Sequence, residues 1–369
     1  TLGDAIAQTP AKRITSGFAD HLQPAFMPDG QSIVYTSKKP KDKHIDRVLA
    51  TSLWRVNVDG SNNREILSLP NWTVESPRPS RDGQAIAFTG SKMDEPAFRQ
   101  TQLGMIAVNA EGQAEPVWLT DEATFEGSVF NFRWIPTQAA AIAFTTAMRG
   151  GFPLMTVNAG LVQPGPLIAS PGDGKQIGVD EFAAGGGAIV YSQTSVANPC
   201  VLRVKDARGD RMVMDLNEWV AAKTISNPTE GWITRPDGVK VQYWVMQPTD
   251  LQAGQKYPLA CEMHGGPSAM WGPGEFTMWH EFQLLCSWGY GVVYCNPRGS
   301  GGYGYEFQKK NFQDWGEGPG GDVLAAVDQA TLSEWVDRNK MVITGGSYAG
   351  YLTAWIIGHE NRFKAAVAQ

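Results

Sequence analysis

Short apolar runs recur along the first 220 residues at nearly constant spacing. Each begins with isoleucine and is separated from the next by polar, turn-rich sequence; the four runs are Ile33–Thr36, Ile86–Thr89, Ile142–Thr145 and Ile189–Ser192. Their first residues lie 53, 56 and 47 positions apart. A period of about fifty residues made of short strands is typical of four-stranded propeller blades, whereas a β-sandwich needs no in-phase repeats. Helical repeats are excluded, because Gly and Pro interrupt the chain too often.

Four such modules are visible, and the chain begins inside one. Arg13–Thr15 matches Trp118–Thr120, a stretch that closes a module, yet little precedes it. A propeller needs enough blades to close its ring and hide its sheet edges. The sequence therefore predicts an incomplete β-propeller over residues 1–222.

After Trp219 the pattern changes to strands that alternate with helices. The predicted strands are 232–234, 239–246, 257–263, 291–295, 341–344 and 363–368, and the predicted helices are 275–288, 321–336 and 348–359. Such alternation is typical of a mainly parallel sheet with helices on both faces. We therefore expect a second, α/β domain over residues 223–369.

Composition and charge exclude several classes of partner. The net charge is −6 and the sequence contains no Lys/Arg cluster, so nucleic acid is not expected. No apolar run has the length of a membrane span or reads as a signal peptide, so we expect a soluble protein, with cytoplasm and periplasm both open. The four cysteines form no CxxC pair and no metal-ligand spacing, so neither a metal nor another cofactor is expected, while a disulfide stays open.

The strongest chemical motif is Gly345-Gly346-Ser347-Tyr348-Ala349-Gly350, which follows a predicted strand and precedes a predicted helix. A nucleophile elbow needs this order, because the serine sits on a strained strand-to-helix turn with small neighbours. The helix N-terminus also presents N–H groups to a developing oxyanion. We therefore predict that Ser347 is a catalytic nucleophile.

A second motif, His264-Gly265-Gly266-Pro267, follows the predicted strand 257–263. This is the position of the loop that completes the oxyanion hole in α/β-hydrolases, where glycines let the backbone approach the substrate. We assign the oxyanion hole to the N–H groups of Gly266 and Tyr348. Each donor contributes about 3 kcal/mol of transition-state stabilisation.

Together these motifs resemble the prolyl oligopeptidase family of serine peptidases, in the branch of acylaminoacyl-peptidases and bacterial dipeptidyl-peptidases. The shared segments are His264–Pro267, Asn296–Gly304 and Gly345–Tyr351, and the resemblance covers essentially the whole chain. It implies a β-propeller that caps an α/β-hydrolase domain and limits substrates to short peptides. Ala349 stands where the family usually has glycine, and alanine still fits a tight elbow.

The resemblance also implies a Ser–Asp–His triad, and here the sequence departs from the family. In α/β-hydrolases the Asp and His follow the serine, but only 22 residues follow Ser347 and none is Asp. His359 lies roughly 18 Å along the same helix and cannot be the base. His21, His44 and His280 have no implied partner, His264 is expected to be structural, and Asp322 and Asp328 read as surface charge. We expect the catalytic Asp and His to lie outside this chain.

Other motifs have a simpler interpretation. Gly299–Gly304 fits G-x-G-x-x-G, but no amphipathic helix follows it, so nucleotide binding is not expected. Asn71–Thr73 is a glycosylation sequon that means little without secretion. Glu75, Glu95 and Glu126 could each grip a substrate amine, although solvated loop carboxylates are more common.

Three functions stay open. The first is a serine exopeptidase that releases dipeptides or acylated residues from short peptides through an acyl-enzyme on Ser347. The others are an esterase with a propeller lid and a non-catalytic scaffold. The elbow and the oxyanion loop favour the peptidase. This chain alone is expected to have little activity, because an oxyanion hole without a general base accelerates the reaction only about 10³–10⁴-fold over the uncatalysed rate in water. Oligomeric state and subsite preference stay open.

Overall fold

The computed structural model describes residues 11–38, 50–94, 99–110, 115–135, 141–158, 165–168 and 177–369. The chain forms two compact units, residues 1–95 with 101–120 and residues 96–100 with 121–369, and each is described by itself. The predicted boundary after residue 222 falls within the second unit and stays a prediction. Among the helices described, none is long and apolar enough to cross a membrane.

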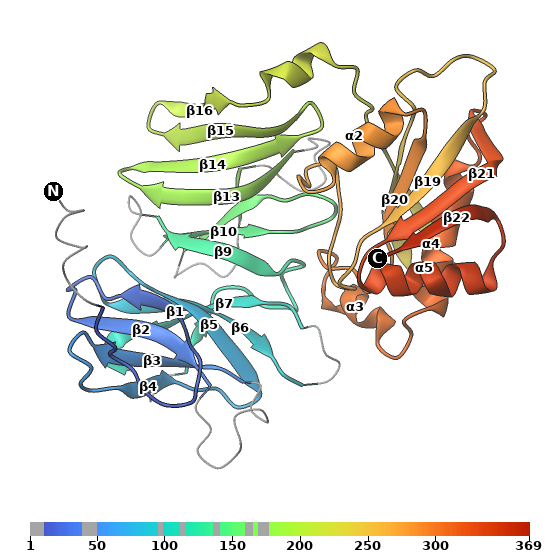
Figure 1. Cartoon of the computed structure of the whole chain (residues 1–369). Helices are drawn as coiled ribbons and strands as arrows, with labels where there is room; N and C mark the ends of the chain where they lie inside the picture. The colour runs from blue at the N-terminus through green and yellow to red at the C-terminus, as the bar shows by residue number, and fades with distance from the viewer. Residues whose placement is uncertain are drawn as a thin grey trace. The chain divides into compact units, whose positions relative to one another are not determined.

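The first unit contains two antiparallel four-stranded sheets (Figure 1). Their strands are β1 (His21–Phe26), β2 (Ser32–Ser37), β3 (Ser52–Asn57) and β4 (Arg64–Leu67), then β5 (Trp72–Pro79), β6 (Ala85–Lys92), β7 (Gln102–Ala107) and β8 (Val117–Trp118). The apolar runs at Ile33 and Ile86 form the second strand of each sheet. Val34, Leu53 and Ile86 are fully buried in the shared core.

Two further sheets of this kind belong to the second unit. Their strands are β9 (Val129–Trp134), β10 (Ala141–Thr146), β11 (Leu154–Asn158) and β12 (Gly165–Ile168), then β13 (Ile177–Gly185), β14 (Ala188–Ser195), β15 (Asn198–Asp206) and β16 (Gly209–Asp215). Ile142 and Ile189 again lie in the second strands. The predicted modules are thus four-stranded antiparallel sheets, while their closure into a propeller stays a prediction.

A six-stranded sheet follows, in the order β17-β18-β20-β19-β21-β22. Its strands are β17 (Thr229–Thr234), β18 (Lys240–Met246), β19 (Tyr257–Met263), β20 (Gly291–Asn296), β21 (Val336–Gly345) and β22 (Phe363–Ala368). The pairs β19–β20, β19–β21 and β21–β22 are parallel, whereas β17 and β18 add an antiparallel edge. The carboxyl ends of β19 and β21 therefore meet at one edge, which is where His264 and Ser347 follow.

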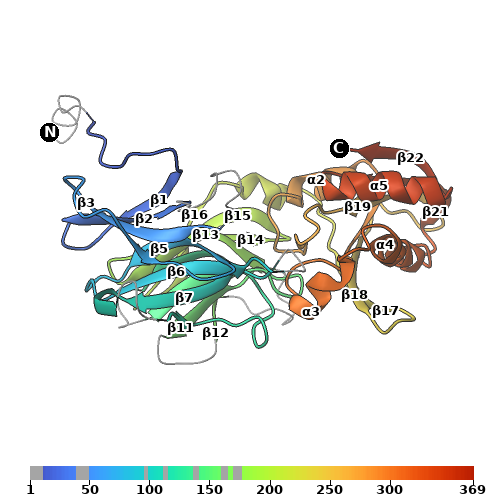
Figure 2. The same ribbon diagram turned by 90° about the horizontal axis from the view of Figure 1, so that it is seen from below.

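Helices cover both faces of this sheet, and β20 shows the division. Val292 and Tyr294 pack with α2 (Trp279–Ser287), whereas Val293 and Cys295 pack with α4 (Glu317–Ala330) and α5 (Tyr348–His359). Consecutive strand residues point to opposite faces, so β20 contributes to two separate cores. α4 and α5 lie side by side on one face (Figure 2).

Two predicted helices have wrong boundaries. The helix predicted over 321–336 is α4 over 317–330, and Val336 opens β21 instead. The helix predicted from Glu275 begins at Trp279, because the Glu275 carboxylate accepts hydrogen bonds from the N–H groups of Thr277 and Met278 and closes a turn first. The stretch after Gly304, where no amphipathic helix was expected, contains the single helical turn α3 (Tyr305–Gln308), which is too short to be such a helix.

Candidate active site

Ser347 lies on a sharp turn between β21 and α5. Its backbone angles are φ 57° and ψ −123°, a region that residues other than glycine rarely adopt and that costs about 1–3 kcal/mol. The side chain is exposed at the N-terminus of α5. Such strain persists only where the surroundings enforce it.

Close packing around this turn explains its small residues. A Cβ on Gly345 would lie 2.5 Å from the Ala349 Cβ, and one on Gly350 would lie 2.3 Å from the Gln369 carbonyl oxygen. The Ser347 N–H donates to that same carbonyl at 2.9 Å, and the Tyr351 N–H donates to the Ser347 carbonyl at 3.1 Å. The turn is thus fixed between the end of β22 and the first turn of α5.

The loop after β19 runs directly beside Ser347. A Cβ on Gly265 would lie 3.3 Å from the Ser347 Cβ and 3.8 Å from its Oγ. Gly266 has a φ of +120°, and a Cβ there would lie 2.4 Å from the Ser268 nitrogen, so the turn requires glycine. Among the described residues, the N–H groups of Gly266 and Tyr348 have no hydrogen-bond acceptor. The two loops that were expected to form the site are therefore neighbours, and the role of each N–H group stays a prediction.

His264 is buried beneath this loop at 4% exposure. Its Nδ1 lies 2.9 Å from the Gly265 carbonyl oxygen and its Nε2 lies 3.0 Å from Ser300 Oγ. Burial lowers its pKa to about 4, so the ring is neutral near pH 7. The Ser300 hydroxyl itself donates to the Pro297 carbonyl oxygen at 2.7 Å, so both His264 ring nitrogens face partners that are held within the protein, which fits the predicted structural role.

Glu262 is a buried carboxyl that the sequence reading did not consider. It lies on β19, two residues before His264, and is 4% exposed. Burial and, to a lesser extent, the nearby Glu281 raise its pKa to about 8. At neutral pH the side chain is therefore mostly protonated.

Asp322 was predicted to be a surface charge, and this is wrong: it is 0% exposed on α4. Arg298 Nε donates to its Oδ2 and an Arg298 Nη donates to its Oδ1, both at 2.9 Å, while Arg235 Nε lies 3.2 Å away as an ion pair. These arginines compensate the buried charge. The sequence carried a signal, since Asp322 shares a helix face with Ala326 and Ala330, which are buried. Asp328 is exposed, as predicted, and pairs with Arg362.

The candidate carboxylates for a substrate amine have different surroundings. Glu126 forms a two-point ion pair with Arg149, so its charge is already compensated. Glu75 is exposed on β5, in the first unit. Glu95 lies outside the described residues.

No described histidine hydrogen-bonds to the Ser347 hydroxyl. His359 is exposed at the end of α5, where its Nδ1 pairs with the Trp355 carbonyl oxygen. His280 is exposed on α2 and His21 lies on β1 in the first unit. His44 lies outside the described residues.

The cysteines are all free thiols. Cys261, Cys286 and Cys295 are buried, and Cys200 is exposed. Burial raises the pKa of each buried thiol. No cluster of His, Cys, Asp and Glu among the described residues could hold a metal ion.

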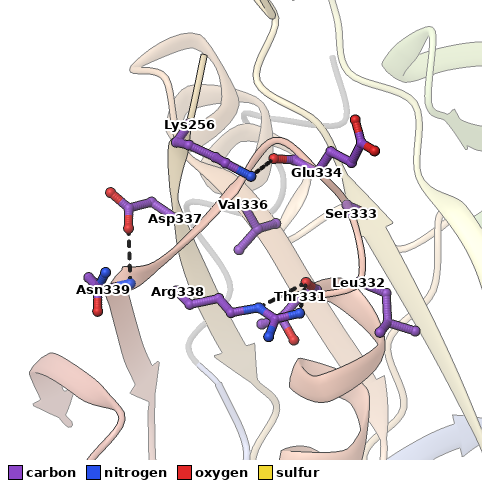
Figure 3. A pocket seen from close by; sticks show the side chains of 9 residues that line it. All are labelled: Lys256, Thr331, Leu332, Ser333, Glu334, Val336, Asp337, Arg338 and Asn339. Atoms are coloured by element: carbon purple, nitrogen blue, oxygen red, sulfur yellow. Dashed lines mark hydrogen bonds between the residues drawn. The ribbon is translucent and has the colours of Figure 1, made fainter. Parts of the chain in front are cut away.

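A cavity of about 500 Å³ lies at the start of β21, and Figure 3 shows the side chains that line it. Its basic side chains are engaged by backbone: Lys256 Nζ donates to the Glu334 carbonyl oxygen, and Arg338 donates to the Thr331 carbonyl oxygen. The cavity lies around Val336, whereas Ser347 follows Gly345 at the other end of β21. Val336 and Gly345 pair with Tyr257 and Met263 of β19, which are roughly 20 Å apart by strand rise. The cavity is therefore not part of the Ser347 site.

Comparison with known proteins gives related peptidases. Residues 275–369 match the model of the prolyl oligopeptidase family. A Bacillus subtilis protein named uncharacterized peptidase YuxL is 46% identical over 154 residues, 42% of this chain and 23% of that protein. Dipeptidyl-peptidase 5 of Schizosaccharomyces pombe is 25% identical over 360 residues, 91% of this chain and 48% of that protein. The chain thus spans less than half the length of these two relatives.

Solved structures share the fold. The Pyrococcus horikoshii acylaminoacyl peptidase has a TM-score of 0.70 at 18% identity, covering 95% of this chain and 63% of that one. A Mycobacterium tuberculosis puromycin-hydrolyzing peptidase has a TM-score of 0.68 at 19% identity, covering 94% of this chain and 53% of that one. At these identities the likeness concerns the fold alone.

Proposed function

The chain belongs to the prolyl oligopeptidase family, and from this premise we propose that it carries the nucleophile and the oxyanion donors of a serine exopeptidase acting on short peptides. One observation carries the proposal: the exposed Ser347 sits in a strained turn at the N-terminus of α5, with Gly265 of the neighbouring loop against it. Strain of this kind is found where a side chain must be held ready for chemistry.

In the proposed reaction, Ser347 Oγ attacks the scissile carbonyl and its proton passes to a general base. The carbonyl oxygen becomes negative and accepts hydrogen bonds from the N–H groups of Gly266 and Tyr348, which have no described acceptor of their own. Collapse breaks the C–N bond, and the amine leaves with the proton from the base. Water then hydrolyses the acyl-enzyme by the same steps.

The general base is proposed to be a histidine that is not among those described. His264 is unsuited, because burial lowers its pKa to about 4 and its ring nitrogens pair with Gly265 and Ser300. The other described histidines lie on β1, on α2 and at the far end of α5. The acidic partner of this histidine is likewise proposed to be a residue that is not among those described.

The names of the relatives support release of a dipeptide or of an acylated residue. Glu126 is a weak candidate for gripping a free substrate amine, because Arg149 already occupies both of its oxygens. The choice between the two products is therefore left to experiment.

The test uses the complete gene product and its Ser347→Ala variant. A fluorophosphonate probe is expected to label the parent at Ser347 and to leave the folded variant unlabelled. Dipeptidyl anilides, acylaminoacyl anilides and an aryl ester then separate the activities. Turnover of the ester alone would favour an esterase, and a folded parent without label would refute the proposal.

A further inference from the structure

The Asn296 side chain makes a two-point clamp on the loop that carries Gly266. The Trp271 N–H donates to Asn296 Oδ1 at 2.9 Å, and Asn296 Nδ2 donates to the Trp271 carbonyl oxygen at 2.7 Å. Asn296 is 0% exposed at the end of β20. The side-chain amide thus pairs with the N–H and the carbonyl of Trp271 as a neighbouring strand would.

A chain of hydrogen bonds fixes the direction of that amide. Asn296 Nδ2 also donates to the Tyr303 hydroxyl at 2.7 Å, and this hydroxyl donates to Gln242 Oε1 at 2.6 Å. Gln242 Nε2 in turn donates to Glu230 Oε1 at 2.8 Å. Gln242 is buried and Tyr303 is partly buried, and the chain of hydrogen bonds ends on the Glu230 carboxylate, which only accepts. The Asn296 amide therefore cannot reverse without breaking this chain.

The glycine-rich segment after β20 supports the same loop. The Gly301 N–H lies 3.2 Å from the Ser268 carbonyl oxygen and 3.1 Å from that of Ala269. A Cβ on Gly301 would lie 2.6 Å from the Ser268 oxygen. Glycine here permits contact between two stretches of backbone, which explains a G-x-G-x-x-G pattern without a nucleotide.

We propose that Asn296, held by Tyr303, is a positioning residue that fixes the loop 264–272 and thereby the direction of the Gly266 N–H. The inference rests on the proposed function, since it concerns the oxyanion donor of that reaction. A donor must be held within a few tenths of an ångström to favour the transition state. Loss of the clamp should therefore lower the rate of chemistry more than substrate binding.

The test uses Asn296→Ala, Asn296→Asp and Tyr303→Phe in the complete gene product. Hydrogen exchange of peptides covering 264–272 is measured by mass spectrometry, together with kcat, KM and the rate of fluorophosphonate labelling. For Asn296→Ala we expect at least tenfold faster exchange in this loop, with kcat and labelling reduced about 10- to 100-fold and KM within about twofold. Asn296→Asp, which keeps the acceptor for the Trp271 N–H, and Tyr303→Phe should give smaller changes in the same direction.

The chain offers a matched control in Gln283. Its side-chain amide clamps Ser226 in the same way, accepting from the Ser226 N–H and donating to the Ser226 carbonyl oxygen, both at 2.8 Å. Gln283→Ala should speed exchange around residue 226 and leave both exchange in 264–272 and labelling unchanged.

The outcomes separate the two proposals. Unchanged exchange in 264–272 for folded Asn296 variants would overturn the clamp, and faster exchange with unchanged kcat would overturn its positioning role. A parent that is never labelled would refute the proposed function, while exchange would still test the clamp. If Asn296→Ala does not fold, Asn296→Asp and Tyr303→Phe decide by the same measurements.

Discussion

Arg298 and Asp322 join the loop after β20 to α4 through one buried carboxylate. Two side-chain hydrogen bonds of 2.9 Å are supplemented by the Arg298 N–H, which donates to Asp322 Oδ2 at 2.9 Å. Asp237 accepts a further bond from Arg298 at 2.7 Å. The segment that carries the Asn296 clamp is therefore anchored to a helix on the opposite face of the sheet.

Asp322→Asn should strongly destabilise the protein. The amide keeps the size of the side chain but removes the charge and one acceptor. Arg235 then loses the carboxylate that faces it, and Arg298 keeps only its pair with Asp237. We expect urea unfolding to show a loss of about 3–5 kcal/mol. Asp328→Asn, which disturbs an exposed pair with Arg362, should change the free energy of unfolding by less than about 1 kcal/mol. Equal effects would contradict the role assigned to Asp322.

Gly350→Ala and Gly346→Ala should differ although both flank Ser347. A Cβ on Gly350 would lie 2.3 Å from the Gln369 carbonyl oxygen, whereas one on Gly346 meets nothing nearer than the Gln369 Cβ at 3.9 Å. We expect Gly350→Ala to cost about 1–3 kcal/mol and Gly346→Ala to change stability little. Thermal unfolding of the two variants checks this, and a more stable Gly350→Ala would show that the turn is looser than described.

Ser347→Gly should stabilise the protein relative to Ser347→Ala. Both variants remove the hydroxyl and are expected to abolish phosphonate labelling, but only glycine adopts φ 57° and ψ −123° without strain. Glycine loses more conformational entropy on folding, which offsets part of this gain, so we expect the free energies of unfolding of the two variants to differ by about 1 kcal/mol. Denaturant midpoints measure it, and a Ser347→Ala variant of equal or greater stability would argue against strain at this turn.

The buried Glu262 should make stability depend on pH. Its pKa is raised from 4.5 to about 8, so between these values the folded chain binds more protons than the unfolded chain. The contribution of Glu262 to stability is complete below about pH 4.5 and is lost as the pH rises to about 8, with a slope of at most about 1.4 kcal/mol per pH unit. Glu262→Gln should remove this component. Parallel stability profiles of parent and variant would contradict the raised pKa.

Much of the α/β sheet was readable from the sequence, because its strands and helices follow one another as separate apolar runs. Strands 257–263 and 363–368 and helix 348–359 were predicted with the boundaries that the structure has. The start of α4 was missed, because Gly316, Gly318 and Gly320 have the low helix propensity of glycine. A Cβ on Gly320 would lie 2.7 Å from the Trp355 ring, so this glycine serves the contact between α4 and α5.

The parts of the site that depend on short, continuous sequence segments could be predicted. A strand–turn–helix order places Ser347, and a strand followed by glycines places Gly266. The Asn296 clamp and the Arg298–Asp322 pair were missed because each joins residues about 24 or 25 positions apart, and no periodic pattern relates such partners.

The alternation along β20 constrains how this domain can change its length. Val292 and Val293 serve different cores, and Asn296 follows with the same parity as Val292 and Tyr294. An insertion or deletion of one residue within the strand would exchange the two cores and turn the Asn296 amide away from Trp271 at once. Length variation is therefore tolerated beyond the strand ends but not inside β20, so the spacing from Gly291 to Asn296 should stay constant wherever this arrangement is kept.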